Sequence, residues 1–231
     1  ASVEARRDSD GFRVTFTFAA PTPAALFRRA DTVWLVFDHA KPIDVEQIRV
    51  KGGAVVGDVS PLPLETGQAI RIRLNRPQMP SLESGGSANG TEWTLTFADR
   101  GQASPLPLMV LRNIADRARA SVSVPLANPG ALHRLLDPDA GDTLLVVTAP
   151  PPTRGFIKRQ DFVELSLLES VHGVAAHPNS DDVSAEVGAD KVMFGRPGGL
   201  TLSSADVAAE RATAAVRPLF DGAAAPTADL P

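Results

Sequence analysis

The chain contains an internal repeat, and this constrains the fold more than any single motif. Residues 22–38 read TPAALFRRADTVWLVFD, and residues 128–148 read NPGALHRLLDPDAGDTLLVVT. A repeated phrase of this kind is typical of one supersecondary unit used twice. The residues that match at one offset of 106 positions are Ala25 with Ala131, Leu26 with Leu132 and Arg28 with Arg134.

The repeated unit is predicted to be a strand, a Pro-marked connector and a second strand. Residues 12–18 (FRVTFTF) align with residues 118–124 (ARASVSV) at the same offset. After a short insertion, Asp31-Thr32 matches Asp142-Thr143, and each pair leads into an apolar strand. The connectors PAALFRR and PGALHRL are each expected to form one helical turn after their proline.

Short alternating segments bounded by Pro and Gly predict half-buried antiparallel strands throughout the chain. They form four units, at residues 12–38, 69–99, 118–149 and 162–202. The SPLPL segments at 60–64 and 104–108 are predicted to be edge or polyproline-like, because proline cannot donate to a ladder. The residues expected to point into a core include Phe12, Val14, Phe16 and Phe18, Ile70, Ile72 and Leu74, Trp93, Leu95 and Phe97, Ala120, Val122 and Val124, and Trp34.

These patterns predict an all-β fold of two tandem β-sandwich-like repeats with one C-terminal helix. The first repeat is expected at 1–104, the second at 105–202, the helix at 203–217 and a linker-like tail at 218–231. The alternative is a small β-propeller-like array of the four shorter units. Two sandwiches are favoured because the match at 106 residues is far better than any match at half that spacing.

Composition narrows the classes of function. The 231 residues carry a net charge of −4, which gives no general attraction to nucleic acid. The chain has no Cys and no apolar run near the ~20 residues of a membrane-spanning helix. It opens without Met or a signal h-region, so it is either a processed chain or a piece of a longer one. The tail DGAAAPTADLP indicates that a further domain follows.

Residues 12–43 resemble the AMIN domain, a β-sandwich of the bacterial cell envelope, and residues 118–149 echo the resemblance. The second copy departs from the pattern because no acidic residue follows Val147 as Asp38 follows Phe37. More loosely, the chain resembles the N-terminal β region that precedes helical repeats in large bacterial envelope proteins. The matching residues are Phe12 to Phe18, Pro21, Pro23, Phe27, Arg29 and Trp34 to Asp38.

The resemblance implies a non-catalytic module that localises a larger protein to peptidoglycan or another wall polymer. The expected location is the periplasm or cell envelope, and the family has no catalytic residues to carry over. The alternative is a structural or protein-interaction scaffold without a polymer ligand.

Searches for catalytic and metal patterns return weak signals, so the sequence predicts a non-enzyme without cofactor or metal. The histidines of HGVAAHPNSDD (172–182) have spacing unsuited to a shared metal and are expected to lie in a loop. His133 replaces Phe27 of the first copy, which favours a packing position. The Gly-rich SGGSANG (84–90) lacks the Lys and helix of a phosphate loop, and no G-x-S-x-G is present.

Arginine gives the candidate binding residues. Of the 23 basic residues, 19 are Arg, and their planar guanidinium groups suit the carboxylates or phosphates of an envelope polymer. A merely solvated strand face is the competing interpretation. The candidate ligand-binding residues are Arg13, Arg28, Arg29, Arg71, Arg73 and Arg76.

Overall fold

The computed structural model describes residues 1–9, 11–85, 91–98 and 105–203. The predicted border after residue 104 follows a segment outside this part of the chain. The predicted tail, and the predicted helix beyond Ser203, also lie outside the described residues.

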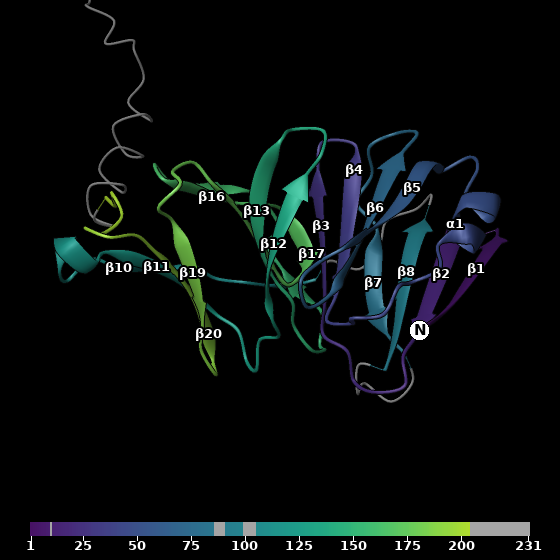
Figure 1. The fold of residues 1–231 in the computed structure, drawn as a ribbon, viewed down its shortest axis with the longest axis horizontal. Helices are drawn as coiled ribbons and strands as arrows, with labels where there is room; N and C mark the ends of the chain where they lie inside the picture. Colours follow the sequence, from purple (N-terminus) through teal and green to yellow (C-terminus); the bar gives the residue numbers. More distant parts are fainter. Residues whose placement is uncertain (10, 86–90, 99–104, 204–231) are drawn as a thin grey trace, which may run out of the picture.

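Four larger sheets stack as layers along the long axis of the molecule, and a two-stranded sheet completes the described strands (Figure 1). We call the larger ones the first outer, first inner, second inner and second outer sheets. All their strand pairs are antiparallel, as is usual for hairpin-linked sandwiches. This layered arrangement confirms the predicted all-β class, and the layers do not radiate around an axis as propeller blades would.

In sheet order, the strands of the first sandwich divide between two layers. The first outer sheet contains β1 (Ser2–Asp8), β2 (Gly11–Thr17), β8 (Glu92–Ala98) and β7 (Ser81–Ser84). The first inner sheet contains β17 (Ser170–His172), β3 (Ala24–Arg29), β4 (Thr32–Phe37), β6 (Gln68–Leu74) and β5 (Val56–Pro63).

The second sandwich is built in the same way. The second inner sheet contains β12 (Leu132–Asp137), β13 (Asp142–Val147), β18 (Val174–Pro178), β16 (Leu165–Leu167) and β15 (Gln160–Asp161). The second outer sheet contains β10 (Leu111–Asn113), β11 (Ser121–Pro125), β20 (Lys191–Gly195) and β19 (Ser184–Val187). The remaining elements are α1 (Glu46–Lys51), the 3₁₀ turn η1 (Arg117–Arg119) and a short parallel pair of β9 (Leu106–Pro107) with β14 (Arg154–Gly155).

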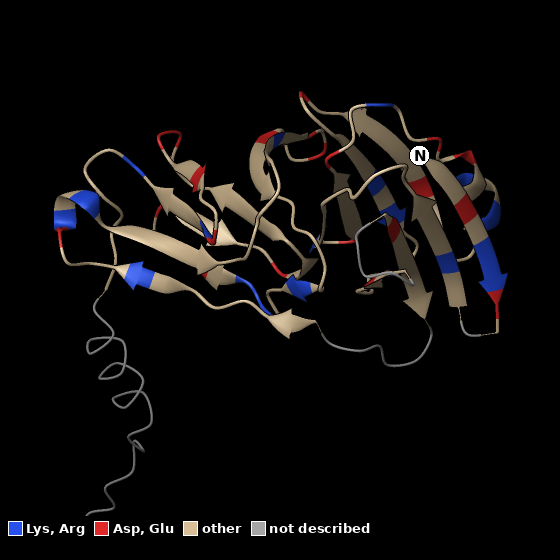
Figure 2. Ribbon diagram, turned by 90° about the horizontal axis from the view of Figure 1, so that it is seen from below, with Lys and Arg blue, Asp and Glu red and all other residues tan. Residues whose placement is uncertain are grey.

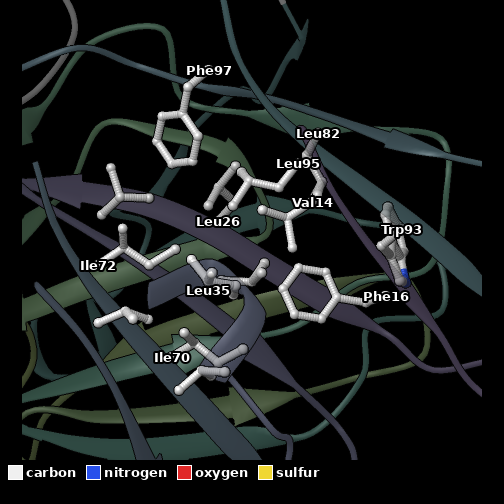
Figure 3. Close-up of a cluster of buried hydrophobic side chains, with 14 of the residues drawn as sticks. Val14, Phe16, Leu26, Leu35, Ile70, Ile72, Leu82, Trp93, Leu95 and Phe97 are labelled. Carbon is white, nitrogen blue, oxygen red and sulfur yellow. The ribbon is translucent and has the colours of Figure 1, made fainter. Parts of the chain in front are cut away.

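Each sandwich has its own core. In the first, Phe16 and Trp93 of the outer sheet face Leu35 and Ile70 of the inner sheet, and all four are fully buried (Figure 3). In the second, Val122 and Phe194 of the outer sheet share a cluster with Leu145 of the inner sheet. The alternation that predicted these strands is therefore confirmed, and Trp34 and Trp93 are both core residues.

A third core joins the two sandwiches, because the inner sheets pack against each other. Phe27 and Trp34 from the first inner sheet are fully buried in one cluster with Leu135, Leu144 and Val146 from the second. The strands concerned are the β3–β4 and β12–β13 hairpins, which are the two copies of the repeated phrase. The duplication therefore places one hairpin against the other and completes a core that neither copy covers alone.

The connectors are strands, which corrects the helical-turn prediction. PAALFRR contributes β3, and PGALHRL contributes the first four of the six residues of β12. Ala24 and Leu26 face the first core while Ala25 and Phe27 face the junction. A strand buried on both faces has no polar alternation in its sequence, and burial decides its structure over the local proline signal.

The second strand of the repeat aligns one residue differently from the sequence match. Trp34 and Val36 face the junction, as do Leu144 and Val146, so the offset is even and not 111. Arg28 pairs with Val33 and Arg134 with Leu145, which gives an offset of 145 − 33 = 112. Because side chains alternate between the two faces of a strand, a one-residue shift would exchange core and junction positions. Asp38 and Thr148 each directly follow the second strand of their hairpin, β4 and β13.

β17 joins the two halves of the chain through backbone hydrogen bonds. It comes from the second half of the chain but pairs antiparallel with β3 of the first inner sheet.

The SPLPL prediction is confirmed at 60–64, since β5 is the edge strand of that sheet. No helix in the described part of the chain is long and apolar enough to cross a membrane.

Candidate functional site at the junction of the two sandwiches

Arg29 connects the sandwiches through two carboxylates. It leaves the end of β3, donates to both oxygens of Asp142 at 2.5 Å and donates to Asp137 Oδ2 at 2.8 Å. His177 Nε2 lies 2.8 Å from Asp142 Oδ2, and its Nδ1 lies 3.0 Å from Asn179 Oδ1. The hydrogen bond from Arg29 lowers the pKa of Asp142, and Asp142 in turn raises the pKa of Arg29 above its ordinary value. This fork-to-carboxylate geometry is the strong form of an ion pair.

Arg71 and Arg73 form a second connection between the sandwiches. Both belong to β6 and donate to Asp139 Oδ2 in the β12–β13 turn, Arg73 at 2.8 Å. Their face of β6 is therefore turned towards the second sandwich, where the sequence suggested an outward face. Partial desolvation opposes ionisation of Asp139, yet the hydrogen bonds from Arg71 and Arg73 lower its pKa.

A groove of about 930 Å³ opens beside the Arg29 cluster. We call it the junction groove. Arg28 lines it and is bonded to Glu169 Oε2 at 3.2 Å, and Arg159 lines it while pairing with Asp161 at 2.6 Å. Its wall is built from both halves of the chain, by Arg28, Arg29, Ala30, Asp31, Pro77, Arg159, Leu168, Glu169, His177 and Asn179.

At the opposite end of the β3–β4 hairpin, Asp38 is the centre of a polar cluster. His133 Nε2 lies 2.6 Å from Asp38 Oδ1, and the Thr148 hydroxyl donates to the same oxygen at 2.8 Å. The other oxygen accepts from the backbone N–H of Ala131 at 2.8 Å. Since a carboxylate only accepts, the proton between them is assigned to His133 Nε2. The packing role predicted for His133 is confirmed, and its side chain is 1% exposed.

His172 is also buried, which differs from the loop position expected from sequence. It lies in β17, fully enclosed, with Nδ1 accepting from the Arg154 N–H at 3.1 Å and Nε2 donating to the Ala149 carbonyl at 2.9 Å. Burial lowers the pKa of His172 to about 4. His172 therefore serves as a neutral crosslink between backbone segments.

The six candidate arginines do not form one surface. Arg28 and Arg29 meet in the junction groove, while Arg71 and Arg73 meet on Asp139. Arg13 lies on the first outer sheet beside Asp8, 3.7 Å away. The sixth, Arg76, is exposed and precedes Pro77 of the groove wall. Basic and acidic positions are interspersed over both sandwiches (Figure 2).

The cluster at Asp38 contains the residue types of a hydrolytic triad without its connectivity. In a triad the nucleophile bonds the imidazole and the carboxylate orients it. Here the hydroxyl of Thr148 bonds the carboxylate, and His133 is closed off from solvent. Among the described residues, no group of three or more His, Asp and Glu side chains could hold a metal ion.

No family model, curated protein or solved structure matches this chain. The AMIN-like resemblance of residues 12–43 therefore stays a prediction.

Sequence reasoning missed the carboxylates and Arg159. Asp137 and Asp139 belong to the insertion that interrupts the second copy of the repeat, and Asp142 directly follows it, so that insertion was the available signal. Their arginine partners are 66 to 113 residues away, and such pairings leave no local pattern.

Proposed function

We propose that the chain is a non-catalytic binding module in which the two sandwiches act as one body, and that the junction groove binds a carboxylate-bearing polymer of the cell envelope such as peptidoglycan. The groove exists only where the two repeats meet, so the duplication itself creates the site.

The observation that supports this proposal is the placement of three guanidinium groups, Arg28, Arg29 and Arg159, along one groove. Arg29 is fixed by its two aspartates and forms the rigid wall. Arg28 and Arg159 keep 29% and 56% of their side chains exposed and each has one carboxylate partner. Their remaining N–H donors suit carboxylate groups of a ligand. A site of exposed cations also predicts that binding weakens with salt.

A non-catalytic role is supported by the connectivity of the junction. Three of the four histidines have ring nitrogens bonded within the protein. His133, His172 and His177 each have partners at one or both ring nitrogens. An acid–base catalyst instead needs a ring nitrogen within reach of substrate.

The test is co-sedimentation with isolated peptidoglycan sacculi at about 20 mM and about 150 mM salt, spanning a Debye length of roughly 20 to 8 Å. The proposal predicts pelleting of the wild-type chain at low salt. It predicts a several-fold smaller pelleted fraction for an Arg28→Ala/Arg159→Ala double variant.

The matched control is Arg6→Ala/Arg119→Ala, which removes two exposed arginines remote from the groove, one on each sandwich. Within the described residues, the one carboxylate partner of each is local, Glu4 for Arg6 and Asp116 for Arg119. This variant should pellet like wild type. Equal losses in both variants, or no pelleting at all, would refute binding through the groove.

A scaffold without a polymer ligand is the second candidate, and a specific observation favours it. Arg29, Arg71 and Arg73 are bonded to aspartates of the other sandwich, so half of the candidate arginines hold the molecule together. If the sacculi experiment is negative, this function remains, and the junction then serves to fix the spacing of two interaction surfaces.

A further inference from the structure

Two equivalent strands of the repeat differ in what lies beside them. β3 has a neighbour on both sides, β4 and β17, whereas β12 pairs only with β13 among the described strands. The side of β3 that faces away from β4 is thus occupied by β17. The corresponding side of β12, which faces away from β13, is an open sheet edge. An open edge presents unpaired backbone donors and acceptors to any extended chain.

The filled edge shows what the open one could bind. β17 adds to β3 antiparallel, with Ser170 opposite Phe27. The preceding residue, Glu169, accepts from the Arg28 backbone N–H at 3.4 Å and from its guanidinium at 3.2 Å. One short segment therefore supplies both a strand and a carboxylate to an arginine of β3.

Arg134 occupies the position equivalent to Arg28, and its side chain has no hydrogen bond or ion pair within the described residues. It is exposed and shares one face of β12 with Leu136, which is 57% exposed. These two line a cleft of about 680 Å³ whose apolar wall includes Leu145 and Val183. The second repeat thus retains the arginine and an apolar wall without the strand that would cover them.

Two other sheet edges, those of β5 and β1, are less suited to strand addition. The β5 edge carries Pro61 and Pro63, which cannot donate to a new neighbour. β1 exposes the like charges of Arg6 and Arg7 in succession. Protective residues of this kind are common on edges that must stay unpaired.

We propose that the open edge of β12 binds an extended peptide segment of a partner protein that carries a glutamate or aspartate opposite Arg134. The segment adds antiparallel to β12, as β17 does to β3, and its apolar side chains cover Leu136. Main-chain bonds supply most of the affinity in such β-augmentation, and side-chain pockets supply specificity. The site is separate from the junction groove and does not depend on a polymer ligand.

The probe is a fluorescein-labelled peptide of residues 167–174 (LLESVHGV), which is the chain's own β17 with Glu169. Fluorescence anisotropy with the full chain is expected to show saturable binding. Arg134→Glu replaces attraction with repulsion and should weaken binding about tenfold, which is 1.4 kcal/mol. A peptide with Glu169→Arg should bind this variant better than it binds wild type.

Arg119→Glu is the matched control, because Arg119 is exposed and lies outside β12. It should leave the affinity unchanged. Hydrogen exchange adds a structural readout, with slower amide exchange expected across residues 132–137 when peptide is bound. The proposal is overturned if no saturable binding occurs, if Arg134→Glu and Arg119→Glu weaken binding equally, or if the charge swap fails to restore it.

Discussion

Thr148 Oγ1 donates a 2.8 Å hydrogen bond to Asp38 Oδ1, so the residues that follow equivalent strands of the two repeats bind each other. Where the first copy has the acceptor Asp38, the second copy has the donor Thr148. Loss of exact repetition at this position is what lets the two hairpins recognise one another.

Asp38→Ala should lower the free energy of unfolding by about 2–4 kcal/mol, because it leaves the Ala131 N–H, His133 Nε2 and the Thr148 hydroxyl without their shared acceptor. Urea titration followed by circular dichroism measures the change. Asp38→Asn keeps one acceptor oxygen and should cost less. Glu65→Ala, at an exposed carboxylate, is the control and should stay within about 0.5 kcal/mol of wild type. An Asp38→Ala result as small as this control would contradict the assignment.

Gly130→Ala should also destabilise the junction. A Cβ at Gly130 would lie 2.2 Å from Thr148 Oγ1 and 2.6 Å from Asp38 Oδ2, so the cluster would have to move. A loss of about 2 kcal/mol is expected in the same urea titration. Gly53→Ala is the matched control, since its added Cβ meets nothing within 4 Å. If the two glycine variants unfold alike, close packing at Gly130 is not required.

The part of this fold that sequence predicts is the part with a local signature. Alternation placed Phe16 and Trp93 in a core because their strands, β2 and β8, each have one buried and one less buried face. β3 has its first four residues buried and carries no such alternation, so its proline suggested a helical turn. The Asp38–His133 contact spans 95 residues and depends on how the inner sheets meet, which neither segment encodes alone.

His172 predicts a loss of stability in mild acid. Its pKa is about 4 in the folded chain, below the 6.5 of an exposed histidine, so the folded state favours the neutral ring. The unfolded chain binds the proton more readily between these values, and stability present above pH 6.5 is lost as the pH falls towards 4. The contribution is about 3 kcal/mol. Urea titrations at pH 7 and pH 5 should capture about 2 kcal/mol of it.

His172→Gln is the comparison, because an amide can keep a donor and an acceptor without titrating. This variant should be less stable than wild type at pH 7, but its stability should fall less between pH 7 and pH 5. Parallel pH profiles for the two proteins would show that the acid sensitivity arises elsewhere.

The shared junction predicts that the two sandwiches unfold together. Both tryptophans belong to the first sandwich, so tryptophan fluorescence reports that half while far-UV circular dichroism reports both. Val192→Ala removes a buried side chain from the core of the second sandwich and should cost about 2 kcal/mol. In a single cooperative transition, it lowers the fluorescence midpoint as much as the dichroism midpoint. Val14→Ala, in the first core, is the matched control and lowers the fluorescence midpoint in any case. If Val192→Ala leaves the fluorescence midpoint unchanged, the sandwiches unfold independently, and β17, the junction core and the arginine–aspartate pairs do not couple them.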